Sequence, residues 1–241
     1  MIIDCHAHIG RSEILEYWWA LEADVEKVLE LEKKAGVDRV VVFPVHHRPE
    51  KYPEANKEVA QAASRYPDRI IPFAKVAASH PDAPRHLLEA IELYKVKGLK
   101  LHADEGFPTR EIMNILLDHG LPLIIHIDEP IRLEPLAKTY PDVVIIIAHL
   151  GSYTFNYYHQ LQAIYLASRY DNVYLDTSVG SSLRRGLIHA VKEAGPEKML
   201  FGSDAPEFHP AVERMKIEIL DISEREKRMI LGENMRHILK L

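Results

Sequence analysis

The chain repeats a short apolar run followed by a segment with helical periodicity, and this alternation constrains its fold more than any other feature. The apolar runs are rich in Val, Ile and Leu, which is typical of parallel strands buried on both faces. Eight such runs occur, at residues 2–9, 37–45, 69–76, 96–102, 121–128, 143–150, 173–178 and 199–204. Their alternation with helical segments predicts an α/β fold built from β-α units.

The segments between the apolar runs are amphipathic. Residues 24–35 place Val25, Val28 and Leu29 on one side and Glu or Lys on the other, as expected for a helix that covers a sheet. Further helices are predicted at residues 56–66, 83–94, 109–119, 132–140, 155–169, 183–194, 210–220 and 223–239. A doubly wound sheet is the alternative, but no Gly-x-Gly-x-x-Gly follows a predicted strand. Eight β-α units in a chain of this length predict a single-domain (β/α)8 TIM barrel over residues 1–241.

Composition limits the partners and the compartment. The net charge is -6 and there is no basic block, which argues against nucleic acid or an anionic membrane as a partner. A single cysteine excludes an internal disulfide and is typical of the reducing cytoplasm. The chain begins without a basic segment and a long apolar run, so we expect no signal peptide and no membrane span. The expected partner is a small-molecule substrate, and assembly into a homo-oligomer is left open.

The first predicted strand carries the sequence Asp-Cys-His-Ala-His. Successive side chains along a strand point to opposite faces, so His6 and His8 share a face with Cα atoms about 7 Å apart. Two imidazoles at that spacing can bind one ion; the alternative is a pair of histidines on a solvated face. Asp4 is expected on the face of His6, and Cys5 on the opposite face, toward the helices.

Polar side chains also end the later strands. They are His102, His126, His149, Asp176 and Asp204. In a (β/α)8 barrel the carboxyl ends of the strands form one rim, where active sites lie. Packing alone does not explain repeated polar groups there, because each buried polar group needs a partner. Neutral imidazoles and a carboxylate are ligands that zinc prefers, and a catalytic site keeps one position open for water.

These motifs resemble those of the amidohydrolase superfamily of metal-dependent hydrolases. The resemblance rests on Asp-x-His-x-His in the first strand, single histidines ending the fifth and sixth strands, and Phe-Gly-Ser-Asp-Ala-Pro at the eighth. The closing Ile-Leu-Gly-Glu-Asn-Met-Arg-His-Ile-Leu is similar to the C-terminal signature of the amidohydrolase-related branch. The resemblance implies that His6, His8, His126 and Asp204 bind the metal. It also implies that His149 contacts the bound water or the substrate, or binds a second metal.

The function expected from these roles is hydrolysis. A zinc ion lowers the pKa of its water toward about 7, Asp204 can accept the proton of that water, and His149 can polarise the scissile carbonyl. We therefore predict Asp204 and His149 as catalytic residues of a hydrolase that cleaves an amide, ester or lactone. The alternative is a metal-dependent, non-oxidative decarboxylase of an aromatic or unsaturated acid, which the same branch contains. The short connections of this chain favour hydrolysis, because such decarboxylases are usually longer.

The fourth predicted strand bears on metal stoichiometry and on substrate contacts. Two-metal members of the superfamily commonly bridge their ions with a carboxylated lysine or a glutamate from this strand. Here Lys100 lies one layer deeper than His102 and no glutamate ends the strand, so one zinc ion is favoured and a second is left open. Lys100, His102 and Arg48 are the predicted substrate contacts, although a solvated loop is the alternative for Arg48. Asp176 either supports a histidine ligand or accepts backbone hydrogen bonds.

Overall fold

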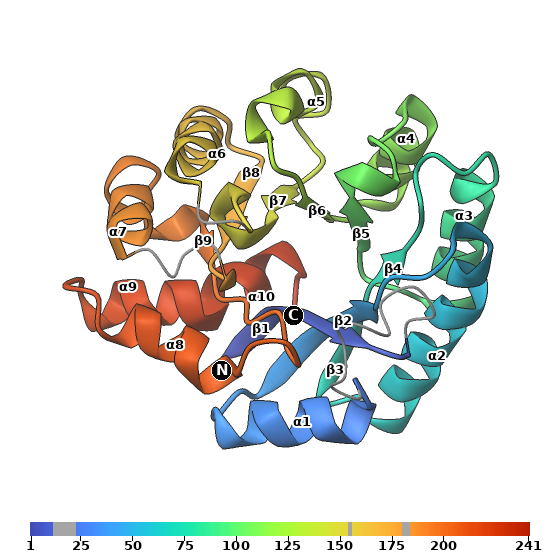
Figure 1. Cartoon of the computed structure of the whole chain (residues 1–241), viewed down its shortest axis with the longest axis horizontal. Helices are drawn as coiled ribbons and strands as arrows, with labels where there is room; N and C mark the ends of the chain where they lie inside the picture. Colours follow the sequence, from blue (N-terminus) through green and yellow to red (C-terminus); the bar gives the residue numbers. More distant parts are fainter. Residues whose placement is uncertain (12–22, 154–155, 180–183) are drawn as a thin grey trace.

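The computed structural model describes residues 1–11, 23–153, 156–179 and 184–241, and within them parallel strands lie inside a ring of helices (Figure 1). The strands are β1 (Ile3–Ile9), β2 (Arg39–Pro44), β3 (Ile70–Pro72), β4 (Ala74–Lys75), β5 (Leu99–His102), β6 (Leu123–His126), β7 (Ile145–Ile147), β8 (Val173–Asp176) and β9 (Met199–Leu200). Every pairing between neighbouring strands is parallel. β3 and β4 together form the third predicted strand.

Backbone hydrogen bonds outside the strands close the ring. Between the two sheets, Phe73 N donates to Val42 O at 2.9 Å and Ala74 N donates to Gly98 O at 2.9 Å, so the chain changes neighbour at Phe73. At the other junction, Cys5 N donates to Phe201 O at 2.9 Å, and Asp204 N donates to His6 O at 2.7 Å. These bonds join β1 to the segment after β9. The predicted (β/α)8 barrel is confirmed, with residues 201–204 irregular rather than part of the last strand.

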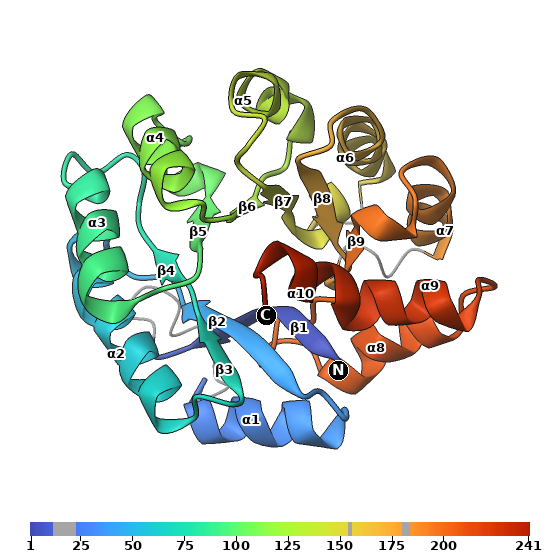
Figure 2. The same cartoon turned by 180° about the vertical axis from the view of Figure 1, so that it is seen from behind.

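The helices follow the strands around the outside, as the view from behind also shows (Figure 2). They are α1 (Val25–Lys34), α2 (Tyr52–Arg65), α3 (Ala83–Tyr94), α4 (Arg110–His119), α5 (Glu134–Thr139), α6 (Tyr157–Arg169), α7 (Arg184–Glu193), α8 (Pro210–Glu218), α9 (Glu224–Arg228) and α10 (Asn234–Ile238). The helix predicted at 132–140 begins as a 3-10 turn, η3 (Pro130–Leu133), before α5. The predicted helix starts at Phe155 and Leu183 lie outside the described residues.

Local sequence sets several helix ends. Thr109 caps α4, because its side chain accepts from Ile112 N, and Gly120 ends that helix with a left-handed backbone. Ser223 and Glu226 form the capping box that begins α9. The helix predicted at 223–239 is interrupted by a π turn, η7 (Met229–Glu233), where Gly232 approaches the start of the chain. A Cβ at Gly232 would lie 2.3 Å from Met1 O, so only glycine fits there.

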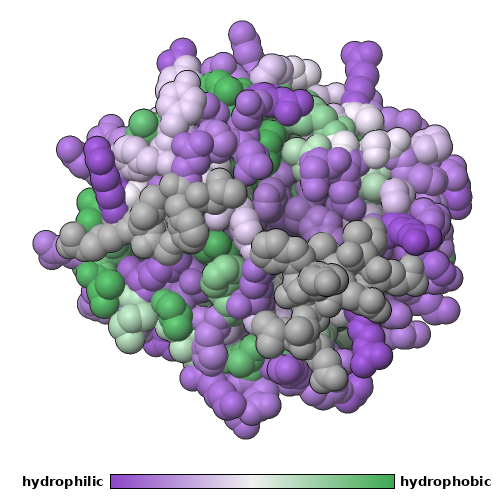
Figure 3. Space-filling view, in the orientation of Figure 1, coloured by the Kyte–Doolittle hydropathy of each residue, from purple (hydrophilic) through white to green (hydrophobic). Residues whose placement is uncertain are grey.

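The face seen in Figure 3 carries mostly hydrophilic side chains, with hydrophobic ones scattered between them. This is the outcome expected for amphipathic helices whose apolar sides pack on the strands. In the described part of the chain, no helix combines the length and the hydrophobicity needed to cross a membrane.

The first strand departs from simple alternation. Its pairing with β2 shifts register between Asp4 and Ala7. Cys5 packs in a buried cluster with Phe43 and Ile124, residues of three different strands that meet inside the barrel. Asp4 instead lies beside Glu32 of α1, whose pKa its charge affects. The expectation that Asp4 shares the face of His6 and that Cys5 faces the helices is therefore wrong, because a bulge changes which side chains point inward.

Candidate metal centre

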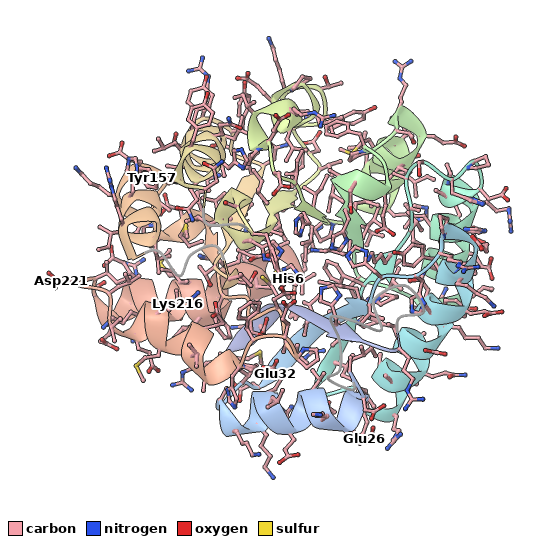
Figure 4. All side chains as sticks on the ribbon, in the orientation of Figure 1. His6, Glu26, Glu32, Tyr157, Lys216 and Asp221 are labelled. Carbon is pink, nitrogen blue, oxygen red and sulfur yellow. The ribbon has the colours of Figure 1, made fainter. Side chains whose placement is uncertain are left out.

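His6, His8 and Asp204 meet at the carboxyl ends of the strands. His6 Nε2 lies 3.3 Å from Asp204 Oδ1, and His8 Nε2 lies 3.1 Å from the same oxygen. Ligand atoms of His6, His149 and Asp204 all lie within 4.8 Å of one another, and all three residues are buried. Figure 4 places His6 at the centre of the ring of strands. Side chains from the two ends of the chain and from its middle therefore converge on one point.

Hydrogen bonds behind the two strand-one histidines set the orientation of their rings. His6 Nδ1 lies 2.8 Å from Asp176 Oδ2, and His8 Nδ1 lies 3.2 Å from Pro44 O. Because an acceptor holds Nδ1 in each ring, Nε2 of each is the nitrogen that faces Asp204. Metal-binding histidines are oriented in this way by a carboxylate or a backbone carbonyl. The donor set and its support fit a divalent metal ion.

His149 and His126 form a chain of contacts in which only His149 lies next to the group of His6 and Asp204. His149 Nδ1 lies 2.8 Å from Ser178 Oγ, and His149 Nε2 lies 3.1 Å from His126 Nδ1. Ser178 in turn donates its hydroxyl hydrogen to Asp176 Oδ1 at 2.5 Å, so its oxygen accepts from His149. His126 thus reaches the group of His6 and Asp204 through His149.

The backbones of His149 and Asp204 are both left-handed, with φ of 58° and 65°. Non-glycine residues rarely adopt this conformation, and it persists only where the surroundings hold it. Two hydrogen bonds do so here, since His149 N donates to Asp176 Oδ1 at 3.0 Å and Asp204 N donates to His6 O at 2.7 Å. The left-handed backbones of both predicted catalytic residues are therefore held by hydrogen bonds to Asp176 and His6.

Burial and charge give most of these groups the protonation states that metal ligands need. Burial lowers the pKa of His8 and of His149 to about 3, so both imidazoles are neutral near pH 7. Burial opposes ionisation of Asp204, but His6 and His8 outweigh it and hold the pKa of that carboxyl well below its usual range. Burial and Lys100 lower the pKa of His6, whereas Asp176 and Asp204 raise it above its ordinary value. His6 is thus the ligand whose proton a metal would displace.

The predicted substrate contacts have different surroundings. Lys100 is buried, and its Nζ lies 3.2 Å from His6 Nε2. Its backbone lies one layer deeper in the barrel than that of His102, and its long side chain spans this difference. His102 is paired in register with His126, and their rings stack with centroids 5.0 Å apart. Arg48 is exposed just before the 3-10 turn η1 (Pro49–Lys51). Lys100 and His102 thus join the rim, whereas Arg48 lies on the surface.

A second group of candidate ligands lies beside the first and consists of His46, His102 and Glu105. Glu105 Oε2 lies 3.6 Å from His46 Nδ1 and 3.7 Å from His102 Nδ1. Lys75 Nζ, fully buried, lies 3.4 Å from the same oxygen. Burial lowers the pKa of Lys75 to about 7, so its amine carries a charge in only part of the molecules near neutral pH. Lys100 Nζ lies as close to His6 Nε2 in the first group, so a neighbouring lysine does not distinguish the two groups as metal sites.

Sequence reasoning missed Lys75, Glu105 and Ser178. Lys75 ends a strand at the same rim as His102, and Glu105 follows His102 by three residues, in a 3-10 turn. Those positions were a usable signal for the first two. Ser178 ends the predicted strand 173–178 on the face of Asp176, so its position was a signal too, although its contact with His149 was not readable from the sequence. Tyr153 was also missed; its ring centroid lies 5.3 Å from that of His149.

Comparisons with known proteins agree on one family and one fold. The sequence model described as amidohydrolase matches residues 3–241. A crystal structure of a putative amidohydrolase from Staphylococcus aureus has a TM-score of 0.79 at 16% identity, over 100% of this chain and 99% of that one. The 5-carboxyvanillate decarboxylase from Sphingomonas paucimobilis has a TM-score of 0.77 at 15% identity, with coverage of 100% and 99%. No curated protein matches the sequence.

A third solved structure is a dihydroxybenzoic acid decarboxylase from Polaromonas sp. JS666, with bound manganese and the inhibitor 2-nitroresorcinol. Its TM-score is 0.79 at 18% identity, over 100% of this chain and 97% of that one. Among these structures the activities that are named are decarboxylations, and this finding overturns the prediction of hydrolysis. The prediction failed because histidine and aspartate ligands are common to both reactions. Connection length, which favoured hydrolysis, says nothing about the bond that is cleaved.

Proposed function

The chain belongs to the amidohydrolase family, and from this premise we propose that it is a metal-dependent, non-oxidative decarboxylase of an aromatic carboxylic acid. The observation that carries the metal dependence is the pair of Nε2 atoms of His6 and His8 at 3.3 and 3.1 Å from one oxygen of Asp204. The similarity of the fold to two aromatic-acid decarboxylases favours decarboxylation as the reaction. The single, buried Cys5 and the acidic net charge support a cytoplasmic enzyme with a small-molecule substrate.

His6, His8 and Asp204 would hold the metal, and a fourth ligand would come from His149 or from His126, which contacts it. We propose zinc, because three or four imidazole and carboxylate ligands suit it; manganese, which the Polaromonas enzyme contains, is the alternative. When bound, the metal would supply a positive charge that orients the substrate carboxylate and stabilises negative charge.

The chain's own residues would relay the proton and form the surroundings of the substrate. Decarboxylation replaces the bond from the ring carbon to the carboxylate with a bond to hydrogen, so one proton must reach that carbon as carbon dioxide leaves. Asp204 is ionised, because its pKa is held well below its usual range, so it can take a proton from water and pass it to that carbon. His149 is held by Ser178 Oγ at its Nδ1, so its Nε2 is the nitrogen that faces His126 Nδ1. Lys100 adds a buried cation that favours binding of an anion.

Activity measurements test the proposal directly. The zinc-loaded and manganese-loaded protein is incubated with a panel of aromatic carboxylic acids, and carbon dioxide and the decarboxylated product are measured together. We expect release of both in equal amounts from at least one acid. The double variant His6→Ala/His8→Ala should lose this activity. Turnover of amides or lactones, with no carbon dioxide from any acid, would contradict the proposal.

A further inference from the structure

The second group, His46, His102 and Glu105, brings three possible ligand atoms together at distances that suit a metal ion better than hydrogen bonds. Glu105 Oε2 lies 3.6 Å from His46 Nδ1 and 3.7 Å from His102 Nδ1, and ligand atoms of all three residues lie within 4.8 Å of one another. The two distances from Glu105 Oε2 are too long for hydrogen bonds. They are close to the separation of roughly 3.3–3.6 Å between neighbouring ligand atoms of a tetrahedral zinc ion bound at about 2.0–2.2 Å.

Two of these atoms are buried and have no hydrogen-bond partner among the described residues. They are His102 Nδ1 and Glu105 Oε2. Buried polar atoms are nearly always paired, so an imidazole nitrogen and a carboxylate oxygen that face each other unpaired indicate an ion that both can bind. Such an ion occupies the small space that its ligand atoms enclose, and it needs no separate cavity.

Tyr52 orients the carboxylate of Glu105. Its side chain is fully buried, and its hydroxyl donates a hydrogen bond to Glu105 Oε1, so Oε2 is the oxygen that faces the two histidines. Carboxylates that bind a metal are commonly held by a hydrogen bond of this kind. Burial raises the pKa of Glu105, but His46, Lys75 and Tyr52 outweigh it and hold that pKa below its ordinary value. The carboxylate is therefore ionised and available to a cation.

The second group lies at the rim, where an ion can enter. His46 follows β2, His102 ends β5, and Glu105 ends the 3-10 turn η2 (Ala103–Glu105). The side chains of His46 and Glu105 are 23% and 15% exposed, so solvent reaches the group. The ring centroid of His102 lies 5.0 Å from that of His126 and 6.3 Å from that of His8. An ion bound here would therefore lie beside the first centre.

We propose that His46, His102 and Glu105 bind a second divalent metal ion, with zinc as the ion that suits them best. Two imidazoles and one carboxylate are a ligand set with which zinc keeps a fourth position open for water. This inference goes beyond the proposed function, because the three residues are separate from the ligands of the first centre. The second site offers three protein ligands whereas the first offers four, so it binds its ion more weakly and fills only when metal is added.

Titration with zinc tests the site in the wild-type protein. The protein loaded with one ion per chain is titrated with zinc chloride by calorimetry, and elemental analysis after rapid removal of free metal checks the stoichiometry. We expect one further ion per chain, bound more weakly than the first. This result needs no variant, so it stands even if a substitution prevents folding. No uptake of a further ion at millimolar zinc would overturn the proposal.

Variants then assign the further ion to the second group. His46→Ala and Glu105→Gln should each weaken its binding by more than ~100-fold, beyond the range of ~10- to 100-fold for groups that only support a ligand. Both should keep the first ion. Glu213→Gln is a matched control that should bind both ions, because Glu213 is a buried glutamate that pairs with Lys216 on α8, outside both groups. A further ion that survives both substitutions would be bound elsewhere and would overturn the site.

The double variant His6→Ala/His8→Ala tests whether the two sites are independent. It should lose the first ion and still take up one zinc ion per chain at the weaker affinity. Failure of the proposed function would leave this uptake unchanged, because the second site contains no residue of the first centre. Uptake that is lost in this variant but present in the wild type would overturn a separate second site.

Discussion

Asp176 Oδ2 lies 2.8 Å from His6 Nδ1, and both side chains are fully buried. The other oxygen of this carboxylate accepts from His149 N at 3.0 Å, so Asp176 supports one metal ligand and the left-handed turn of a predicted catalytic residue. The two functions weighed for Asp176 from the sequence, support of a ligand and acceptance of backbone bonds, are both present. One carboxylate of β8 thereby couples β1 to the 3-10 turn η4 (Ala148–Gly151) that follows β7.

Asp176→Asn tests this support. Asparagine keeps the shape but loses the charge that holds the His6 ring, so we expect metal affinity to fall by about 10- to 100-fold. Competition of the protein against a metal-binding dye measures the change. Asp171→Asn, at the exposed turn before β8, is the control and should bind metal as the wild type does. Unchanged affinity in Asp176→Asn would show that the ring is held by packing alone.

Elemental analysis of the purified protein should find a transition metal at close to one ion per chain. His6→Ala/His8→Ala removes two nitrogens that face the same carboxylate oxygen, so it should abolish the bound metal. A second ion in this same centre would require a bridging ligand such as a carboxylated Lys100, whose Nζ lies 3.2 Å from His6 Nε2. Two ions together with the intact mass of a carboxylated lysine would contradict the prediction of a single ion.

Asp204→Asn separates metal binding from proton transfer. The amide oxygen can still coordinate, but asparagine cannot take or give a proton near pH 7. We expect only a modest loss of metal affinity, whereas turnover of an identified acid should fall at least ~10²-fold, the lower range for loss of a general acid or base. Near wild-type turnover of the metal-replete variant would exclude a proton relay at this residue.

Glu32 gives a pH dependence of stability. Burial, followed by the charge of Asp4, raises the pKa of Glu32 well above its ordinary value. The folded state therefore keeps a proton that the unfolded state loses above about pH 4.3. The stability linked to this proton is complete below that pH and is lost as pH rises toward the raised pKa, at up to ~1.4 kcal/mol per pH unit.

Glu32→Gln removes this titration and keeps the size of the side chain. Its free energy of unfolding should exceed that of the wild type by an amount that grows from pH 5 to pH 8, roughly 1 kcal/mol or more across the range. Urea unfolding at several pH values measures it. A difference that stays constant with pH would mean that Glu32 ionises normally in the folded protein.

The sequence by itself determined the barrel and the rim residues. Buried parallel strands need continuous apolar runs. A polar residue that closes such a run, as His126 and His149 do, marks the end of the strand that lies at the rim. Periodicity and strand ends are local properties, so they can be identified in the sequence without knowledge of the fold. The helix ends at Thr109 and Ser223 were readable for the same reason.

Only the tertiary structure decided which atoms meet. The bulge in β1 reverses the faces of Asp4 and Cys5, since register depends on the partner strand β2. The contact of His149 with Ser178, and the gathering of Lys75 and Glu105 around His102, join segments that no local pattern connects. The choice between hydrolysis and decarboxylation also lies beyond the ligand pattern, because the same metal-binding donors serve both reactions.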